Sequence, residues 1–230
     1  MTQEEIDEDE ERWYCWEEQD WEENKLFYEY DLEYLEELNK RERPPNEGED
    51  AMRELIVKEH TSSSYAPRTY HNASQGCTLA IATDFTTAGE KLTHKAAKGK
   101  IVQIPYGEDT TIAARKLYIL LKKYDCRVLN VAGNGIYTLS KKGVTQRAAN
   151  QYVYDIVSLV HKHWSLEKIV SGGQTGMDIA GLVVGCSLDI ETIGMWPNGF
   201  KIRIVEGRDV NMTEDKIKGL VYGYVGELEL

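Results

Sequence analysis

Short apolar runs alternate with helical stretches over most of this chain, and no other sequence feature limits its fold as strongly. The runs have the length of strands and end in turn residues. The runs are 78–83, 100–105, 127–132, 168–172 and 190–195, and the helical stretches between them are 89–98, 111–123, 145–164 and 176–186. This pattern predicts an α/β fold, with a Rossmann-like, mostly parallel sheet flanked by helices.

Charge divides the chain into two unlike parts. The formal net charge is −12, yet residues 1–50 hold 21 Asp and Glu against 5 Lys and Arg, whereas residues 51–230 hold 18 against 22. We therefore expect an acidic helical extension over 1–60 and an α/β domain over 61–230. The mildly basic body suits a phosphate-bearing ligand better than the overall charge suggests.

The acidic extension carries an apolar stripe. Leu26, Tyr30, Tyr34 and Leu38 recur every fourth residue and so line one side of a helix. A second short helix is expected over 50–60. The extension either packs its stripe on the body or on a second copy of the chain, or captures a partner by imitating nucleic-acid charge. We favour packing, because so many aromatic groups are too apolar to leave in water.

Several protein classes do not fit the composition. The four cysteines lie far apart, the N-terminus has no signal-peptide pattern, and no apolar run has the length of a membrane span. His161 and His163 are two residues apart, a spacing that does not place them on one helical face for a metal. We expect a cytoplasmic protein with no membrane, metal or nucleic-acid partner.

Three loops of anion-friendly composition follow three of the predicted strands. They begin near Asp84, Gly133 and Gly172 and contain glycine, hydroxyl and amide groups. In open α/β sheets, ligands bind beyond the carboxyl ends of the strands, where loops meet helix N-termini with unpaired amides. We therefore expect these three loops to build one binding site.

The loop at 171–178 has the most specific chemistry. Gly172 and Gly173 permit a tight bend and close approach of the backbone, and Gln174 and Thr175 can donate to phosphate or ribose oxygens. Asp178 would lie in the first helical turn, where it stabilises the helix dipole or accepts from a sugar hydroxyl. An ordinary strand-to-helix turn, with glycine used for geometry alone, is the competing interpretation.

Four motifs together resemble the SLOG superfamily, in the branch of YpsA-like and molybdenum-carrier-type proteins that includes circularly permuted members. They lie at 65–74, 78–93, 128–135 and 169–199, and so cover most of the body. The branch typically has Tyr-x-x-Arg-Thr-x-x-Asn, Leu-Asn-Val-Ala-Gly and Ser-Gly-Gly-Gln-Thr-Gly segments, which the chain matches at Tyr65, Leu129 and Ser171.

The chain departs from the branch in three ways. The Ser-Gly-Gly-Gln-Thr-Gly element comes last here, although a rotation of this kind keeps the site if the same strands stay neighbours. The Gly-Gly-Thr of the branch is replaced by residues 88–90, which end in Glu90; this carboxylate would repel phosphate and instead reach a sugar hydroxyl or an amine. The Trp-Cys-Pro-Lys-Gly element loses its lysine but keeps Trp196.

The resemblance implies a class of ligand rather than a reaction. SLOG domains bind nucleotides and their derivatives; some relatives are phosphoribohydrolases, others sense NAD-derived or cyclic nucleotide signals in bacterial defence, and many pair as dimers. The hydrolases carry Pro-Gly-Gly-x-Gly-Thr-x-x-Glu, a string that is absent here. No soft metal ligands support a molybdenum-carrying role.

Four residues outside the loops, or at their edges, have two interpretations each. Arg68 and Asn72 are one helical turn apart and suit an arginine fork on phosphate or carboxylate, although Arg68 could instead cap a carbonyl. Asn130 either pins the adjacent loop or touches ligand. Trp196 either stacks on a ligand ring or packs in the core.

The sequence thus predicts a protein that binds a phosphate-bearing nucleotide or an NAD- or ADP-ribose-derived molecule, as a sensor, carrier or sequestering protein, with a homo-oligomer as the expected assembly. The expected binding residues are Arg68, Asn72, Thr86, Thr87, Gly89, Glu90, Gly133, Asn134, Gly135, Ser171, Gly172, Gly173, Gln174, Thr175, Gly176, Asp178 and Trp196. A nucleotide hydrolase or N-glycosidase is the alternative, with Glu90, Asp84 or Asp178 as its acid or base. A third possibility is an interaction protein that works through the acidic helix.

Overall fold

The computed structural model describes residues 54–229, which belong to one compact unit. The acidic helix predicted within 1–43 lies outside the described residues.

A single six-stranded sheet organises the described residues, and all of its strand pairs are parallel. The strand order is β1-β6-β5-β4-β2-β3. The strands are β1 (Ile56–Glu59), β2 (Cys77–Ala82), β3 (Ile101–Pro105), β4 (Val128–Gly133), β5 (Lys168–Ser171) and β6 (Glu191–Trp196). The prediction of a Rossmann-like α/β fold is confirmed, since each of the five predicted apolar runs forms one of these strands.

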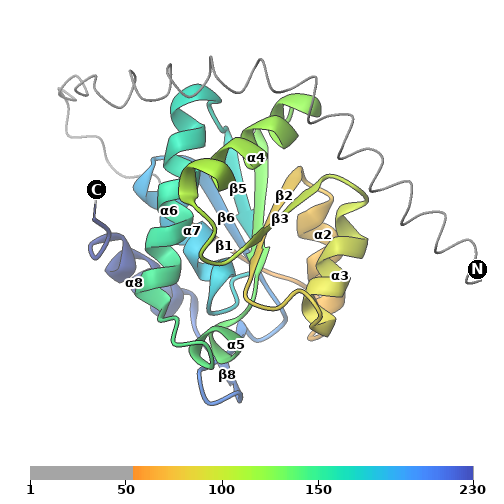
Figure 1. The fold of residues 1–230 in the computed structure, drawn as a ribbon. Coiled ribbons are helices and arrows are strands. Elements are labelled where there is room, and N and C mark those ends of the chain that lie inside the picture. Colours follow the sequence, from red (N-terminus) through yellow and green to blue (C-terminus); the bar gives the residue numbers. More distant parts are fainter. Residues whose placement is uncertain (1–53, 230) are drawn as a thin grey trace, which may run out of the picture. The chain divides into compact units, whose positions relative to one another are not determined.

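Helices cover both faces of the sheet (Figure 1). The helices are α2 (Tyr65–Ala73), α3 (Ala88–Ala97), α4 (Thr110–Lys123), α5 (Ile136–Ser140), α6 (Gln146–His163), α7 (Met177–Ser187) and α8 (Glu214–Val225). Helices α4, α6, α7 and α8 lie on one side, whereas α2 and α3 pack against each other on the other side (Figure 1). The four helical stretches predicted between strands are α3, α4, α6 and α7, and the predicted C-terminal helix is α8.

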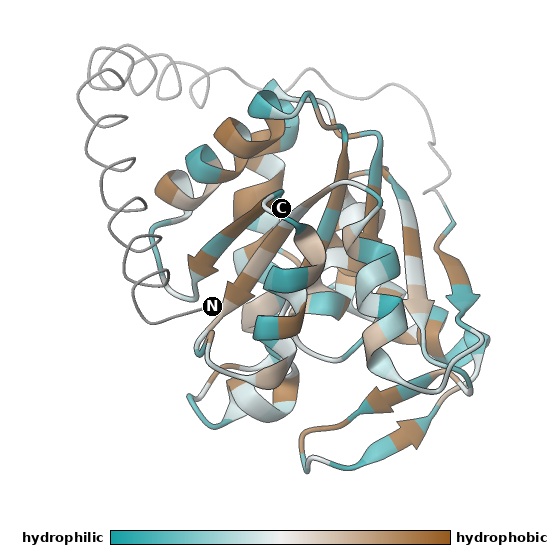
Figure 2. Ribbon diagram, turned by 90° about the vertical axis from the view of Figure 1, so that its right-hand side faces the viewer, coloured by the Kyte–Doolittle hydropathy of each residue, from teal (hydrophilic) through white to brown (hydrophobic). Residues whose placement is uncertain are grey.

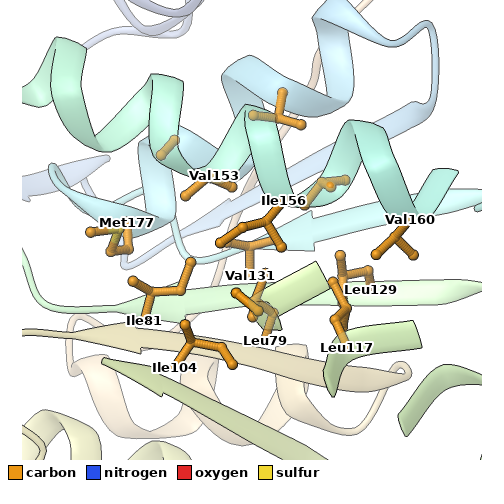
Figure 3. Packing of buried hydrophobic residues seen from close by; sticks show 14 of the residues in the cluster. Leu79, Ile81, Ile104, Leu117, Leu129, Val131, Val153, Ile156, Val160 and Met177 are labelled. Atoms are coloured by element: carbon orange, nitrogen blue, oxygen red, sulfur yellow. The ribbon is translucent and has the colours of Figure 1, made fainter. Parts of the chain in front are cut away.

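The main core lies between the sheet and the larger helical layer. Alternate residues of β2 and β4 point into it, among them Leu79 and Val131, and they pack against Val153 and Ile156 of α6 (Figure 3). Hydropathy follows the same pattern, with the apolar segments concentrated along the central strands (Figure 2). Because these strands are buried on both faces, their sequences read as nearly continuous apolar runs.

Two elements differ from the sequence prediction. The short helix predicted over 50–60 is wrong where the structure describes it, because Ile56–Glu59 form the edge strand β1, paired with β6. The β-branched Ile56 and Val57 favour the strand. The second difference is a small antiparallel hairpin of β7 (Lys201–Arg203) and β8 (Asp209–Asn211), which no sequence pattern predicted and which stands apart from the main sheet (Figure 2).

The direction of the connections opens a crevice at one point of the sheet. After β2 the chain enters α3 on one side, whereas after its neighbour β4 it passes through the short α5 and then enters α6 on the other side (Figure 1). Neighbouring strands whose following helices diverge in this way leave a gap between their carboxyl ends, which is where open α/β sheets bind ligands.

Candidate functional site

A cavity of about 530 Å³ lies at this divergence between β2 and β4. Its floor contains Asn130 and Ala132, which alternate with the core residues of β4 and so face the α2 and α3 side of the sheet. Its walls come from one side of α2 and from the start of α3. The volume falls within the range of small-molecule sites, which is about 300–1,000 Å³.

A buried ion pair joins two walls at the floor of the cavity. Arg68 of α2 donates from Nη1 to Oδ2 of Asp178 in α7 over 3.0 Å, and the two side chains are 7% and 9% exposed. Burial raises the pKa of Asp178, while the neighbouring Arg68 opposes this change. Nε of Arg68 is buried and has no hydrogen-bond partner among the described residues, and Arg68 is one of the residues that line the cavity.

Glu90 is the second carboxyl group at the floor. It is 3% exposed, and burial together with the charge of Asp178 raises its pKa to about 7. Its Oε1 accepts a hydrogen bond from Asn134, whereas Oε2 is buried without a partner among the described residues. Buried polar atoms are normally paired, so an orphan that lines a cavity is a place where a ligand can bind.

Asn134 fixes the loops on either side of the crevice. It follows β4, and its Oδ1 accepts from the backbone amides of Thr83 and Asp84, which follow β2. Its Nδ2 donates to Glu90 over 3.1 Å. One amide side chain therefore sets both the width of the crevice and the orientation of the Glu90 carboxyl group.

The start of α3 faces the cavity. Thr87 is the N-cap residue, and its hydroxyl accepts from the backbone amide of Glu90 over 3.3 Å. Gly89 also lines the cavity, and a Cβ added there would meet no atom closer than 4.0 Å. This helix start therefore leaves open space in front of its first turn, where the dipole favours an anion.

The glycine-rich loop at 172–176 is occupied with internal contacts. The amide of Gln174 donates to Asp178, and the amide of Gly176 donates to Oε1 of Gln146 in α6. The Gln174 side chain binds the hairpin at two points, and the Thr175 hydroxyl donates to a hairpin carbonyl oxygen. The expectation that these two side chains donate to ligand oxygens does not fit this geometry, because the β7–β8 hairpin takes their polar atoms.

Of the two roles open to Trp196 from sequence, the structure gives it core packing. Trp196 is fully buried and does not line the cavity. Its indole lies directly under Gly173 and Gly194, at each of which a Cβ would collide with the ring. Gly173 is therefore needed so that the loop can pass over the indole, and stacking of Trp196 on a ligand would need it to leave the core.

The mouth of the cavity carries aromatic and cationic groups that the sequence did not single out. Arg203 of β7 lines the cavity together with Tyr65 and Tyr137. Its guanidinium lies 5.9 Å from the centre of the Tyr65 ring and pairs with Asp209 across the hairpin over 2.8 Å. Arg203 could not be found from the sequence, because no sequence pattern predicted the hairpin that carries it. Tyr65 could have been found, because it begins the motif that contains Arg68.

Most of the predicted binding residues come together. Those that line the cavity are Arg68, Asn72, Thr87, Gly89, Glu90, Gly133, Asn134, Gly135, Gly172, Gln174, Thr175 and Asp178. Those outside its lining are Thr86, Ser171, Gly173, Gly176 and Trp196. Thr86 donates instead to Asp84, and the Ser171 hydroxyl donates to the carbonyl oxygens of Val131 and Asp178.

The structure also shows where the two remaining candidates lie: Asp84, a possible acid or base, and Asn130, which could hold the adjacent loop or contact ligand. Asp84 does not line the cavity; hydrogen bonds from Thr86 lower its pKa, as suits an acid that caps a turn. Asn130 lines the cavity and also donates to Thr78 on the neighbouring strand β2 over 3.1 Å. Asn130 can thus pin the strands and still present its amide to a ligand.

Two other kinds of site find no support in the described part of the chain. No three or more His, Cys, Asp or Glu side chains of residues 54–229 are grouped so that they could hold a metal ion. None of the described helices combines the length and the apolar character that a membrane crossing needs.

A scan against models of protein families found no match for the chain, and a search of curated proteins found no significant match either.

Proposed function

We propose that the protein binds a phosphate-bearing nucleotide, or a molecule derived from NAD or ADP-ribose, and that it acts as a sensor, carrier or sequestering protein of the SLOG type. One observation carries this proposal: three residues that line the cavity at the sheet's divergence point, Tyr65, Arg68 and Glu90, each have a buried side-chain polar atom without a hydrogen-bond partner among the described residues. The Arg68 donor and the Glu90 acceptor suit the hydroxyl groups of a ribose. The guanidinium of Arg203, which also lines the cavity, suits an anionic group such as a phosphate.

Calorimetric titration tests this proposal directly. The probes are AMP, NAD, ADP-ribose and cyclic ADP-ribose isomers. We expect at least one of them to bind the wild-type protein and to lose affinity by tenfold or more in Gly89→Leu, because the Cβ at this lining position meets open space and the longer side chain would occupy the cavity.

Gly219→Leu is the matched control. Gly219 is also a helical glycine with no atom within 4 Å of an added Cβ, but it lies in α8, away from the cavity lining. It should bind like the wild type. Absence of heat with every probe, or equal binding by both variants, would refute the proposal.

A second candidate function, a nucleotide N-glycosidase or phosphohydrolase, is favoured by Glu90 alone. A carboxyl group with a pKa of about 7 can both donate and accept a proton near neutral pH. Chromatography of the bound probe after long incubation separates the two functions: product formed by the wild type and not by Glu90→Gln would establish hydrolysis, whereas intact ligand would leave binding alone.

A further inference from the structure

Beyond the proposed binding of a nucleotide-type ligand, on which this inference rests, we infer that Arg203 recognises the ligand's phosphate at the cavity mouth while the sugar lies on the floor. The ligand would thus enter sugar first.

The first argument is how firmly the backbone of Arg203 is held. Its amide donates to Oε1 of Gln174 over 3.0 Å, and its carbonyl oxygen accepts from the Thr175 hydroxyl. The neighbouring Ile202 is 4% exposed and packs in the core beside Trp196. Gln174 and Thr175 therefore act as positioning residues, which hold the hairpin so that Arg203 lines the cavity.

The second argument is the state of the Arg203 side chain. Nε and Nη2 pair with Asp209, and Nη1 has no hydrogen-bond partner within residues 54–229. The side chain is 49% exposed, in contrast to the 7% of Arg68. An arginine that keeps a free donor and contact with solvent can bind a phosphate without first giving up a buried partner.

The third argument is the charge at the two ends of the cavity. The floor holds one cation, Arg68, against two carboxyl groups, Glu90 and Asp178. Because Asp178 already pairs with Arg68, this floor gives a phosphate little net attraction, and Glu90 adds repulsion once it is ionised. Hydroxyl groups, in contrast, can donate to Oε2 of Glu90 and accept from Nε of Arg68.

At the mouth of the cavity, positive charge predominates. Arg203 is the cation that lines this part of the cavity. Lys141, which lies 3.7 Å from the centre of the Tyr137 ring, and Lys201, whose charge helps to lower the pKa of Asp209, add positive charge near this part of the cavity without lining it. Favourable interactions with a phosphate are therefore concentrated at the mouth.

The distance between the two ends suits one small ligand. The guanidinium carbons of Arg68 and Arg203 lie 5.7 and 5.9 Å from the centre of the same ring, that of Tyr65. A sugar on the floor and a phosphate at the mouth can therefore belong to one nucleotide, with Tyr65 alongside it.

Titration with AMP and with adenosine tests the inference, because the two probes differ only in the phosphate. We expect the wild type to bind AMP about tenfold more tightly than adenosine, as one charge-assisted contact of about 1.4 kcal/mol would give. In Arg203→Gln, AMP affinity should fall about tenfold while adenosine affinity stays within about twofold, so the preference disappears.

Two further variants control the result. Arg147→Gln removes another exposed arginine, one that pairs with Glu229 away from the cavity, and should keep the preference for AMP. Glu90→Gln should weaken both probes alike if the sugar lies on the floor. If instead it strengthened AMP alone, the phosphate would lie on the floor and the inference would be overturned.

The remaining outcomes separate this inference from the proposed function. If AMP and adenosine bind but Arg203→Gln leaves their ratio as in the wild type, the inference fails and nucleotide binding stands. If the wild type binds neither of these probes nor any other nucleotide of the panel, the proposed function fails and the inference with it.

Discussion

Two arginine–aspartate pairs each place their arginine within 6 Å of the centre of the Tyr65 ring, and the two pairs differ in burial. The pair of Arg68 and Asp178 is almost fully buried, whereas that of Arg203 and Asp209 has side chains 49% and 28% exposed. A buried pair cannot lose one member without leaving an unpaired charge in a poorly solvated place. The pair of Arg68 and Asp178 therefore stabilises the fold, whereas Arg203 can leave Asp209 and bind a ligand instead.

Removal of one partner from each pair should give the largest difference. Asp178→Ala leaves Arg68 buried without a counter-charge and should lower the free energy of unfolding by about 3–5 kcal/mol. Asp209→Ala should lower it by less than about 1 kcal/mol, because water replaces the exposed contact. Urea denaturation of both variants measures the two values. Equal losses would show that burial does not distinguish the pairs.

The carboxyl groups at the two ends should also respond oppositely to pH. The pKa of Glu90 on the floor is raised from 4.5 to about 7, so its contribution to stability is complete below pH 4.5 and is lost as pH rises towards 7. A shift of this size corresponds to a decrease of up to about 3 kcal/mol in the free energy of unfolding. Glu90→Gln should remove that decrease, as urea denaturation at pH 4.5 and 8 can measure.

Asp209 at the mouth provides the contrast. Its hydrogen bond with Arg203 lowers its pKa, so its contribution to stability is present above the unfolded-state pKa and is lost as pH falls. The wild type should therefore have a higher free energy of unfolding than Asp209→Asn at neutral and high pH, and this difference should shrink at low pH.

The Glu90 prediction has its own contrary outcome. If the free energy of unfolding of Glu90→Gln depends on pH as that of the wild type does, the floor does not hold Glu90 in its neutral form.

The smallest expected effect comes from two glycines that line the same cavity. A Cβ at Gly172 would collide with both Arg68 and Asp178, so Gly172→Ala should separate the floor pair and destabilise the fold by about 1–3 kcal/mol. A Cβ at Gly89 meets open space in the first turn of α3, so Gly89→Ala should be neutral or stabilise by up to about 1 kcal/mol. Thermal melts that rank these two variants in the reverse order would contradict the described floor.

Sequence predicted best the parts of the fold that depend on local periodicity. Strands and helices such as β4 and α6 bury a continuous apolar set, and each short apolar run between turn residues marks a strand. The prediction over 50–60 was wrong because a four-residue edge strand is decided by its pairing with β6, far away in the sequence. The hairpin was missed for a similar reason, since each of its strands has only three residues.

The candidate site likewise has a part that the sequence predicted and a part that depends on contacts between distant residues. The order of strands and loops predicted that Glu90, Asn134 and Asp178 face one crevice, because the carboxyl ends of parallel strands meet at one edge, whereas Arg68 was assigned to the site from the family resemblance. The sequence could not predict that the side chains of Gln174 and Thr175 form hydrogen bonds with the hairpin backbone, or that Gly173 packs over the Trp196 indole. Those outcomes depend on which groups happen to lie within hydrogen-bond reach after packing.

By itself, the sequence determined a parallel α/β sheet and the edge at which its polar loops gather, because both follow from local apolar periodicity and chain order. Only the tertiary structure decided which of two similar charge pairs is buried, which carboxyl group has its pKa raised to about 7, and which arginine reaches the mouth. Burial and charge proximity are properties of packed neighbours, and these neighbours come from distant parts of the chain.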